Sequence, residues 1–130
     1  VTICRFYNVY GDYMPTEGEY RTALSIFLEQ YRAGESLTVT GDGEQRRDFT
    51  HVDDIVDALI RVQKQQAYGN NFELGRGKNH SVNEIAKMLN IIPVYKPSKP
   101  GEARNTLNTD TLAKDILGWD PQIDLEDYFI

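Results

Sequence analysis

The sequence has one cysteine, no run of about 18 apolar residues and no excess of basic side chains. The single Cys4 excludes an internal disulfide, and its place in an apolar run predicts a small core residue. Because there is neither a long apolar run nor a signal-peptide pattern, we expect a soluble, cytoplasmic protein without a membrane partner. The net charge of −6 argues against nucleic acid as a partner, since a phosphate backbone requires a dominant basic face.

Motifs that would indicate a complete catalytic site are also missing from the sequence. There is no P-loop, no G-x-S-x-G and no Cys–His pairing, and 41–43 and 75–77 are glycine turns rather than G-x-G-x-x-G loops. No metal site is expected at 51–54. His51 has no second histidine at ligand spacing, and Asp53 or Asp54 is expected to cap the helix that follows.

What is present is an ordinary globular composition, with 40% apolar and 26% charged residues in a chain of 130. That length suits one domain or a large part of a bigger one. Val1 begins directly in a strand-like run, and the chain ends about two turns into a helix-like pattern, so we expect a piece of a longer chain. No interior linker divides residues 1–130, which predicts one unit.

Strand-like and helix-like segments alternate along the chain, which indicates an α/β arrangement with a small mixed sheet. The expected strands are 1–9, which should be buried, 37–40, 45–52, 72–74 and 91–95. The expected helices are 20–31, a helix from 53 or 54 to the break at 68–71, 81–89, a helix from 109 or 110 to 117, and a helical start at 124–130.

Apolar spacing predicts which side of each helix is buried. The first helix has a periodic face closed by Gly34, and the second has a stripe of five apolar residues. Ser81 and Glu84 form a capping box at the start of the third helix. The periodic faces are Tyr20, Ala23, Leu24, Phe27, Leu28 and Tyr31 in the first helix, and Val52, Ile55, Val56, Leu59 and Ile60 in the second.

Two basic groups are candidates for binding an anion. Arg46 and Arg47 are neighbours on an expected strand, so their side chains should point in opposite directions, one of them into a pocket. A second group follows on a Pro-Gly loop and consists of Lys96, Lys99 and Arg104. Both groups could instead be solvated or paired with acidic neighbours. If they converge, the planar fork of arginine suits a diphosphate.

The order of the motifs resembles one family. Along the chain stand RFYNVYG (5–11), GDGEQRRDFTHVDD (41–54), FELGRG (72–77), KPGEAR (99–104) and LGWDP (117–121). This series resembles the extended short-chain dehydrogenase/reductase family, and within it the C-terminal, substrate-binding half of nucleotide-sugar epimerases and dehydratases, UDP-glucose 4-epimerases being the nearest type. The resemblance implies a Rossmann-type α/β fold, of which residues 1–130 supply the last core strands and a small mixed α/β substrate domain.

The resemblance also implies roles for the residues that match the family's motifs. Asn8 is expected to contact the nucleotide-sugar and Arg47 to bind its diphosphate. Glu102 and Arg104 are expected on a loop that closes over the nucleotide. Tyr10 and Gly11 are expected beside the nicotinamide ring of NAD.

Three positions depart from the family pattern. Lys99, a further expected substrate contact, stands where the family usually has arginine, which replaces a fork with a point charge. Asp12 replaces a frequent proline, and Leu112 a common lysine.

The family's G-x-x-G-x-x-G fingerprint and its Tyr-x-x-x-Lys pair lie upstream of RFYNVYG, so no catalytic residue is expected in this chain. In the family, NAD takes a hydride from the sugar while the tyrosine acts as base, and the keto sugar is then reduced or first dehydrated. We expect this chain to bind the nucleotide-sugar of an NAD-dependent epimerase, homodimeric at full length. A dehydratase or decarboxylase of the same family, or a binding module without chemistry, is the alternative.

Overall fold

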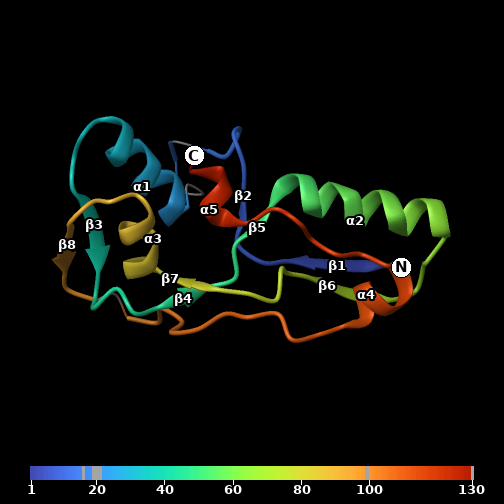
Figure 1. Ribbon diagram of the computed structural model, residues 1–130. Coiled ribbons are helices and arrows are strands. Elements are labelled where there is room, and N and C mark those ends of the chain that lie inside the picture. Colours follow the sequence, from blue (N-terminus) through green and yellow to red (C-terminus); the bar gives the residue numbers. More distant parts are fainter. Residues whose placement is uncertain (16, 19–21, 99, 130) are drawn as a thin grey trace.

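The computed structural model describes residues 1–15, 17–18, 22–98 and 100–129. Strands and helices alternate along the chain, as the sequence predicts (Figure 1). The elements in order are β1 (Ile3–Phe6), β2 (Val9–Tyr10), α1 (Ala23–Arg32), β3 (Leu37–Thr40), β4 (Arg46–Arg47), β5 (Thr50–His51), α2 (Val52–Gln65), β6 (Asn71–Leu74), β7 (His80–Ser81), α3 (Val82–Met88), β8 (Pro93–Lys96), α4 (Leu112–Leu117) and α5 (Leu125–Tyr128).

The strands pair two by two instead of forming the one small sheet that we expected. Within the described ranges, β1 pairs with β6, β2 with β5 and β3 with β8, each in parallel, while β4 and β7 are antiparallel. The pairing is therefore mixed, as predicted. Each strand has two to four residues, so the chain turns away before a wider sheet can form.

The first expected strand, 1–9, is divided into β1 and β2. The prediction that it is buried is wrong, because Ile3 is 41% exposed and Phe6 is 52% exposed. Cys4 is partly buried against a core cluster, so it is a core residue only in part. Among the described residues β1 has one strand neighbour, β6, and its second edge is open.

The expected strand 45–52 is divided into β4 and β5 at Asp48 and Phe49. Asp48 is fully buried, and its carboxylate accepts hydrogen bonds from the backbone N–H groups of Arg76, Gly77 and Asn108 at 2.9, 3.0 and 3.0 Å. Backbone donors that are buried without a partner are costly, so this carboxylate holds two loops in place. No local pattern in the sequence indicates that Asp48 binds backbone N–H groups and not a neighbouring arginine.

Two hydrophobic clusters form the core, at opposite ends of the molecule (Figure 1). The first lies among α1, β3, α3 and α5 and includes Leu24, Phe27, Val39, Ile85 and Leu125. The second lies among α2, β6 and α4 and includes Ile55, Ala58, Phe72, Leu74, Leu117 and Trp119. The short pairs β2–β5 and β4–β7 connect the two ends, and the arginines of interest lie on this connection.

The N-cap of α2 differs from its prediction. His51, not Asp53 or Asp54, is the cap, and its Nδ1 accepts a hydrogen bond from the Asp53 N–H at 3.1 Å. Asp54 is buried, and its carboxylate accepts hydrogen bonds from the backbone N–H groups of Gln122 and Ile123 at 3.2 and 3.0 Å. Asp54 thus binds a segment far away in sequence, which a local capping pattern cannot reveal.

The buried side of α2 also differs from its prediction. Ile55 is buried as expected, together with Ala58 and Val62. The rest of the expected stripe is between 38% and 45% exposed: Val52, Val56, Leu59 and Ile60. The buried side is therefore rotated away from the most apolar side of the helix.

The other helices begin and end close to their predicted positions. Thr22 caps α1, which buries Leu24, Phe27 and Leu28, whereas Tyr31 is exposed and Tyr20 lies outside the described residues.

The capping box of Ser81 and Glu84 is present in α3. Helix α4 begins at Leu112, later than predicted, and ends at Gly118 with a φ of +67°, where glycine is favoured. Strand β8 begins two residues later than expected. Among the described residues, no helix is long and apolar enough to cross a membrane.

Candidate functional site

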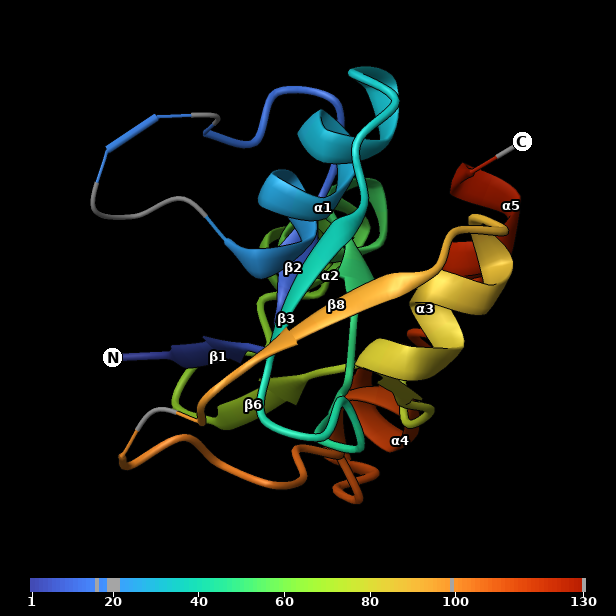
Figure 2. The same cartoon turned by 90° about the vertical axis from the view of Figure 1, so that its left-hand side faces the viewer.

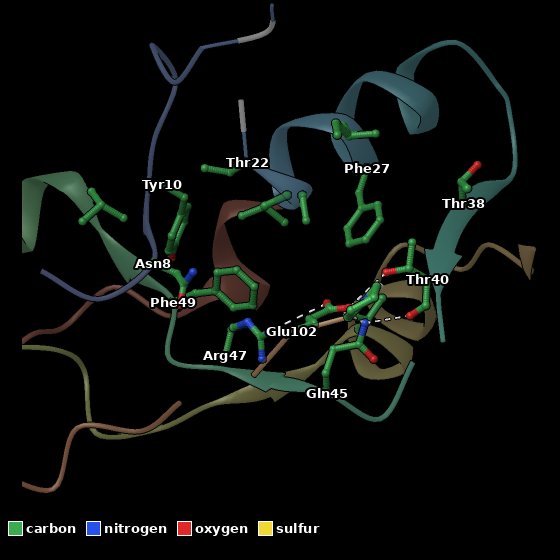
Figure 3. Close-up of a pocket in the computed structure, with 17 residues that line it drawn as sticks. Asn8, Tyr10, Thr22, Phe27, Thr38, Thr40, Gln45, Arg47, Phe49 and Glu102 are labelled. Carbon is green, nitrogen blue, oxygen red and sulfur yellow. Dashed lines mark hydrogen bonds and ion pairs between the residues drawn. The ribbon is translucent and has the colours of Figure 1, made fainter. Parts of the chain in front are cut away.

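One cavity of about 490 Å³ opens beside the first core cluster. Its wall is formed by β2, the first half of α1, β3, residues 45–49 and the loop at 100–102. Figure 3 shows Asn8, Tyr10 and Phe49 at one end of it and Thr38 at the other, with Arg47 and Glu102 between. Sites for small molecules commonly have roughly 300–1,000 Å³, so the cavity is large enough for a nucleotide-sized ligand.

The two neighbouring arginines point in opposite directions, as their positions on a strand predict. Arg46 turns away from the cavity, where its Nη1 donates to Glu84 at 2.8 Å and its Nε donates to Asn79 at 2.9 Å. Arg47 lines the cavity, and its side chain is 17% exposed. In the described part of the chain, its guanidinium donates one hydrogen bond, from Nη1 to the Arg46 carbonyl at 2.8 Å. Arg46 is thus bound within the protein, and Arg47 has donors left for a ligand.

Glu102 is the acidic group that faces Arg47. Its Oε1 lies 3.6 Å from Arg47 Nη2 and accepts a hydrogen bond from Gln45 at 3.3 Å, and its Oε2 accepts one from Thr40 at 3.4 Å. All three contacts are long, so each of them is weak. An anionic ligand at Arg47 would take the place of this carboxylate.

Tyr10 forms the cavity wall next to Asn8. It is 1% exposed, and its ring contacts His51 and Tyr128 edge to face, each with a centroid distance of 5.1 Å. Its hydroxyl has no hydrogen-bond partner among the described residues. Burial raises the pKa of Tyr10, so the phenol stays neutral, and because its hydroxyl is enclosed by the protein, Tyr10 contributes to the cavity as a wall and not as a hydrogen-bond donor.

Asn8 and Gly11 flank this wall. The side-chain oxygen of Asn8 accepts a long hydrogen bond from the Thr106 hydroxyl at 3.4 Å, and its carbonyl accepts one from the Thr50 N–H at 3.1 Å. At Gly11, a Cβ would lie 2.6 Å from Val52 Cγ1. The close approach of α2 therefore requires glycine at this position, whatever binds nearby.

Arg104 lies apart from the cavity that contains Arg47. Its side chain is 65% exposed and makes two hydrogen bonds to the Asp42 carboxylate, at 2.9 and 3.3 Å. It lines a smaller cavity of about 210 Å³, which shares Thr40, Gln45 and Glu102 with the larger one. Lys99 lies outside the described residues. The structure thus brings Asn8, Tyr10, Arg47 and Glu102 together and leaves Arg104 in the neighbouring hollow.

Several lining residues were missed by the sequence reasoning. Thr38 and Thr40 alternate on β3 with the buried Leu37 and Val39, and this period of two could have indicated a polar side facing a cavity. Gln45 carried no such signal. It is 5% exposed, its Nε2 donates to the Thr40 carbonyl at 3.0 Å, and its Oε1 has no partner within the described residues.

No metal centre is formed in the part of the chain that the structure describes, because it contains no cluster of three or more His, Cys, Asp or Glu side chains able to hold an ion. His51, the residue considered from the sequence, uses Nδ1 to cap α2 and its ring to contact Tyr10.

Comparison with known proteins identifies the family. The family described as "NAD dependent epimerase/dehydratase family" matches residues 1–75. A UDP-glucose 4-epimerase of Mycolicibacterium smegmatis is 33% identical over 124 residues, which are 91% of this chain and 39% of that protein.

Solved structures agree with this assignment. The UDP-glucose 4-epimerase of Thermotoga maritima, solved with UDP-glucose, is 35% identical with a TM-score of 0.86, over 97% of this chain and 42% of that one. A UDP-glucuronic acid 4-epimerase of Bacillus cereus, solved with UDP-glucuronic acid and NAD, is 27% identical with a TM-score of 0.86, over 97% of this chain and 41% of that one.

This chain therefore spans about two fifths of the length of these relatives. Their fold confirms the Rossmann-type α/β class that the motif series implied. The family match over residues 1–75 and the identity to the M. smegmatis epimerase together show that the chain belongs to the NAD dependent epimerase/dehydratase family.

Proposed function

We propose that residues 1–130 are the nucleotide-sugar-binding part of an NAD-dependent nucleotide-sugar epimerase, with UDP-glucose as the first candidate substrate. The observation that carries this proposal is the position of Arg47, a largely buried guanidinium with unused donors in a cavity that also contains Asn8 and Tyr10. The two solved relatives, which were crystallised with UDP-glucose and UDP-glucuronic acid, support a nucleotide-sugar as ligand.

The chemistry of the cavity suggests how the ligand lies. The diphosphate would bind Arg47, because a planar guanidinium can donate two parallel hydrogen bonds to phosphate oxygens. The apolar end between α1 and β3, where Leu24 and Phe27 lie, suits the nucleoside base. The sugar would then lie toward Asn8, whose amide can donate hydrogen bonds to its oxygens, with the buried Tyr10 forming the wall beside it.

The described residues do not fit NAD by themselves. They contain no glycine-rich turn between a strand and a helix of the kind that binds a dinucleotide. The Tyr-x-x-x-Lys spacing of Tyr95 and Lys99 lies far downstream of RFYNVYG, whereas the family's catalytic pair lies upstream of that motif. We therefore assign NAD binding and hydride transfer to the remaining part of the family fold. This chain would bind the nucleotide, remote from the reacting carbon, and so orient the sugar.

Titration calorimetry with UDP tests this function. Arg47→Ala should weaken UDP binding by roughly 1.5–3 kcal/mol, as expected for the loss of charge-assisted hydrogen bonds. Arg47→Lys should also bind more weakly, because the fork is lost. The control is Arg5→Ala, which removes an exposed arginine paired with Glu73 away from the cavity. Unchanged UDP affinity of Arg47→Ala would show that the diphosphate does not bind there.

A further inference from the structure

Helix α2 is capped at its N-terminus by a histidine, the type of side chain that ordinarily changes its charge between pH 5 and 8. His51 is the cap, and its Nδ1 accepts a hydrogen bond from the Asp53 N–H at 3.1 Å. Serine, threonine, aspartate and asparagine, the usual capping residues, accept such a bond through oxygen and keep this ability near neutral pH. An imidazole nitrogen accepts only while it carries no proton, so this cap requires a neutral His51 with its proton on Nε2.

Protonation of Nδ1 would remove the cap. The Asp53 N–H would then face another donor, and a positive ring would lie at the positive end of the α2 dipole. The Asp53 carboxylate, whose Oδ2 lies 3.8 Å from Nδ1, would attract the charged ring, but its side chain is 77% exposed and the pair is screened by solvent. A lost cap generally costs more than an exposed ion pair returns, so the protonated ring is the poorer partner for the first turn of α2.

The groups that face His51 from other elements do not provide a substitute cap. Tyr10 on β2 and Tyr128 on α5 contact its ring, with centroid distances of 5.1 and 5.7 Å. Burial raises the pKa of both phenols, so neither supplies a negative charge. The remaining charged groups of this region are held by other partners: Asp54 by residues 122 and 123, Asp12 by Tyr128, and Arg76 and Asp124 by each other. The charge of His51 therefore decides whether α2 is capped.

His51 also supports the wall of the ligand cavity through its neighbours. It pairs with Tyr10 in the parallel ladder of β2 and β5, and Tyr10 lines the cavity. The next residue, Val52, begins α2 and lies so close to Gly11 that a Cβ there would be 2.6 Å from Val52 Cγ1. Figure 2 looks along α2 from its N-terminal end and shows β2 beside this helix. A shift of the first turn of α2 is therefore passed directly to the segment 8–11.

We propose that His51 is a pH-sensitive cap that couples the start of α2 to the wall of the ligand cavity. With a neutral ring, the capped helix holds Tyr10 and the segment 8–11 in the position that receives the sugar. With a protonated ring, the first turn of α2 loosens and this wall loses its support. Affinity for a nucleotide-sugar should therefore be full above neutral pH and fall as the pH decreases toward about 5.5. This inference rests on the proposed function, in which the sugar lies toward Asn8.

Calorimetry with UDP-glucose at about pH 7.5 and about pH 5.5 tests the proposal. UDP-glucose is a better probe than UDP, because the terminal phosphate of UDP itself gains a proton near pH 6. The affinity of the unsubstituted protein should fall about three- to tenfold between the two pH values, which lies within the usual contribution of an N-cap. His51→Asn, whose side-chain oxygen caps at both pH values, should lose less than about twofold.

The matched control is His80→Gln. It removes the only other histidine of the sequence, which is paired with Glu84 and does not line the cavity. This variant should keep the full pH dependence of the unsubstituted protein. Loss of the pH dependence in His80→Gln would assign the effect to the wrong histidine and overturn the proposal.

Amide resonances provide a second measurement that needs neither a substitution nor a ligand. The Asp53 N–H donates to Nδ1 only in the capped state, so its chemical shift should change with the same midpoint as the ring resonances of His51. The Gly11 amide should follow with that midpoint, because Val52 packs against Gly11. These resonances report on the cap and on its coupling to the cavity wall separately.

Three further outcomes would overturn the proposal. They are Asp53 or Gly11 amides that do not respond when His51 titrates, a full pH dependence of affinity in His51→Asn, and an unsubstituted protein with the same UDP-glucose affinity at both pH values. Failure to bind UDP-glucose near pH 7.5 would instead count against the proposed function, and the two amides would still report on the cap and its coupling.

Discussion

The two core clusters differ in how far this chain completes them. The first cluster is surrounded by α1, β3, α3 and α5, and the cavity with Arg47 is a hollow in its polar margin. The second cluster is covered by α2 and α4 on one side and ends at the exposed Phe6 and Leu59 on the other. The chain thus completes the polar cavity around Arg47, while the apolar residues at the edge of the second cluster stay exposed to solvent. The exposed Phe6 and Leu59 mark the side on which this chain leaves the second cluster uncovered.

Asp48 connects the two regions, and its removal should have the largest effect. It follows Arg47 in the chain, and its carboxylate holds the N–H groups of Arg76 and Gly77 just after β6. Asp48→Ala leaves these buried donors without a partner and should lower the free energy of unfolding by about 3–5 kcal/mol. Urea denaturation measures this loss, with the exposed Asp53→Ala as the control. A loss below about 1 kcal/mol would mean that water replaces the carboxylate and that the two regions are held together by other contacts.

Arg46 and Arg47 are adjacent, but Arg46 is hydrogen-bonded within the protein and Arg47 lines the cavity. Substituting each in turn therefore compares a residue that supports the fold with one that faces a ligand. Arg46→Ala removes hydrogen bonds to Glu84 and Asn79 that are partly exposed, and should lower the free energy of unfolding by about 1–2 kcal/mol. UDP affinity should remain within about twofold of the unsubstituted protein, since Arg46 points away from the cavity. Arg47→Ala should show the converse, with weaker binding and little change in stability. Equal loss of UDP affinity in both variants would show that the cavity responds to net charge and not to one guanidinium.

The sequence was sufficient for features that depend on local patterns or on the order of motifs. The capping box of Ser81 and Glu84, the glycine end of α4 and the opposite directions of Arg46 and Arg47 follow from neighbouring residues alone. The family could be identified because several weak motifs occur in a fixed order over nearly the whole chain. The convergence of Asn8, Tyr10, Arg47 and Glu102 on one cavity was expected from that resemblance, and no spacing rule predicts it.

What could not be predicted depends on contacts between distant segments. Asp54 was one of the two residues expected as a local cap, Asp53 being the other, but its carboxylate binds the backbone N–H groups of residues 122 and 123. The stripe on α2 was expected to be buried because periodicity shows which side of a helix is apolar, not what lies against that side. Gln45 lines the cavity because the loop at 100–102 folds over it, and no local pattern near Gln45 indicates this.

Glu102 provides a smaller test of the cavity region. Its carboxylate is weakly held opposite Arg47, so a phosphate has to displace it. Glu102→Gln should raise the affinity for pyrophosphate about two- to fivefold, which corresponds to the roughly 0.5–1 kcal/mol of a partly exposed ion pair. Affinity for uridine, which carries no phosphate, should not rise, and Glu126→Gln on α5 is the control. If uridine gained as much as pyrophosphate, the effect would come from a wider cavity and not from the removal of a competing charge.

The smallest effect is expected at Glu84, on the side of β4 that faces away from the cavity. Hydrogen bonds from Arg46, supported by the Ser81 N–H, hold the pKa of the Glu84 carboxyl below its ordinary value of 4.5. Because the pKa is lower in the folded state, the ionised carboxyl contributes stability above about pH 4.5 and loses this contribution as the pH falls through the folded pKa. The difference in free energy of unfolding between the unsubstituted protein and Glu84→Gln should therefore be about 0.5–1 kcal/mol near neutral pH, since the pair is partly exposed, and should shrink toward about pH 3. Urea denaturation at both pH values measures it, with UDP affinity near neutral pH expected to be unchanged. A difference that stayed constant with pH would show that Glu84 acts through its shape in the capping box, and that the charge of Arg46 has no share in holding β4 to α3.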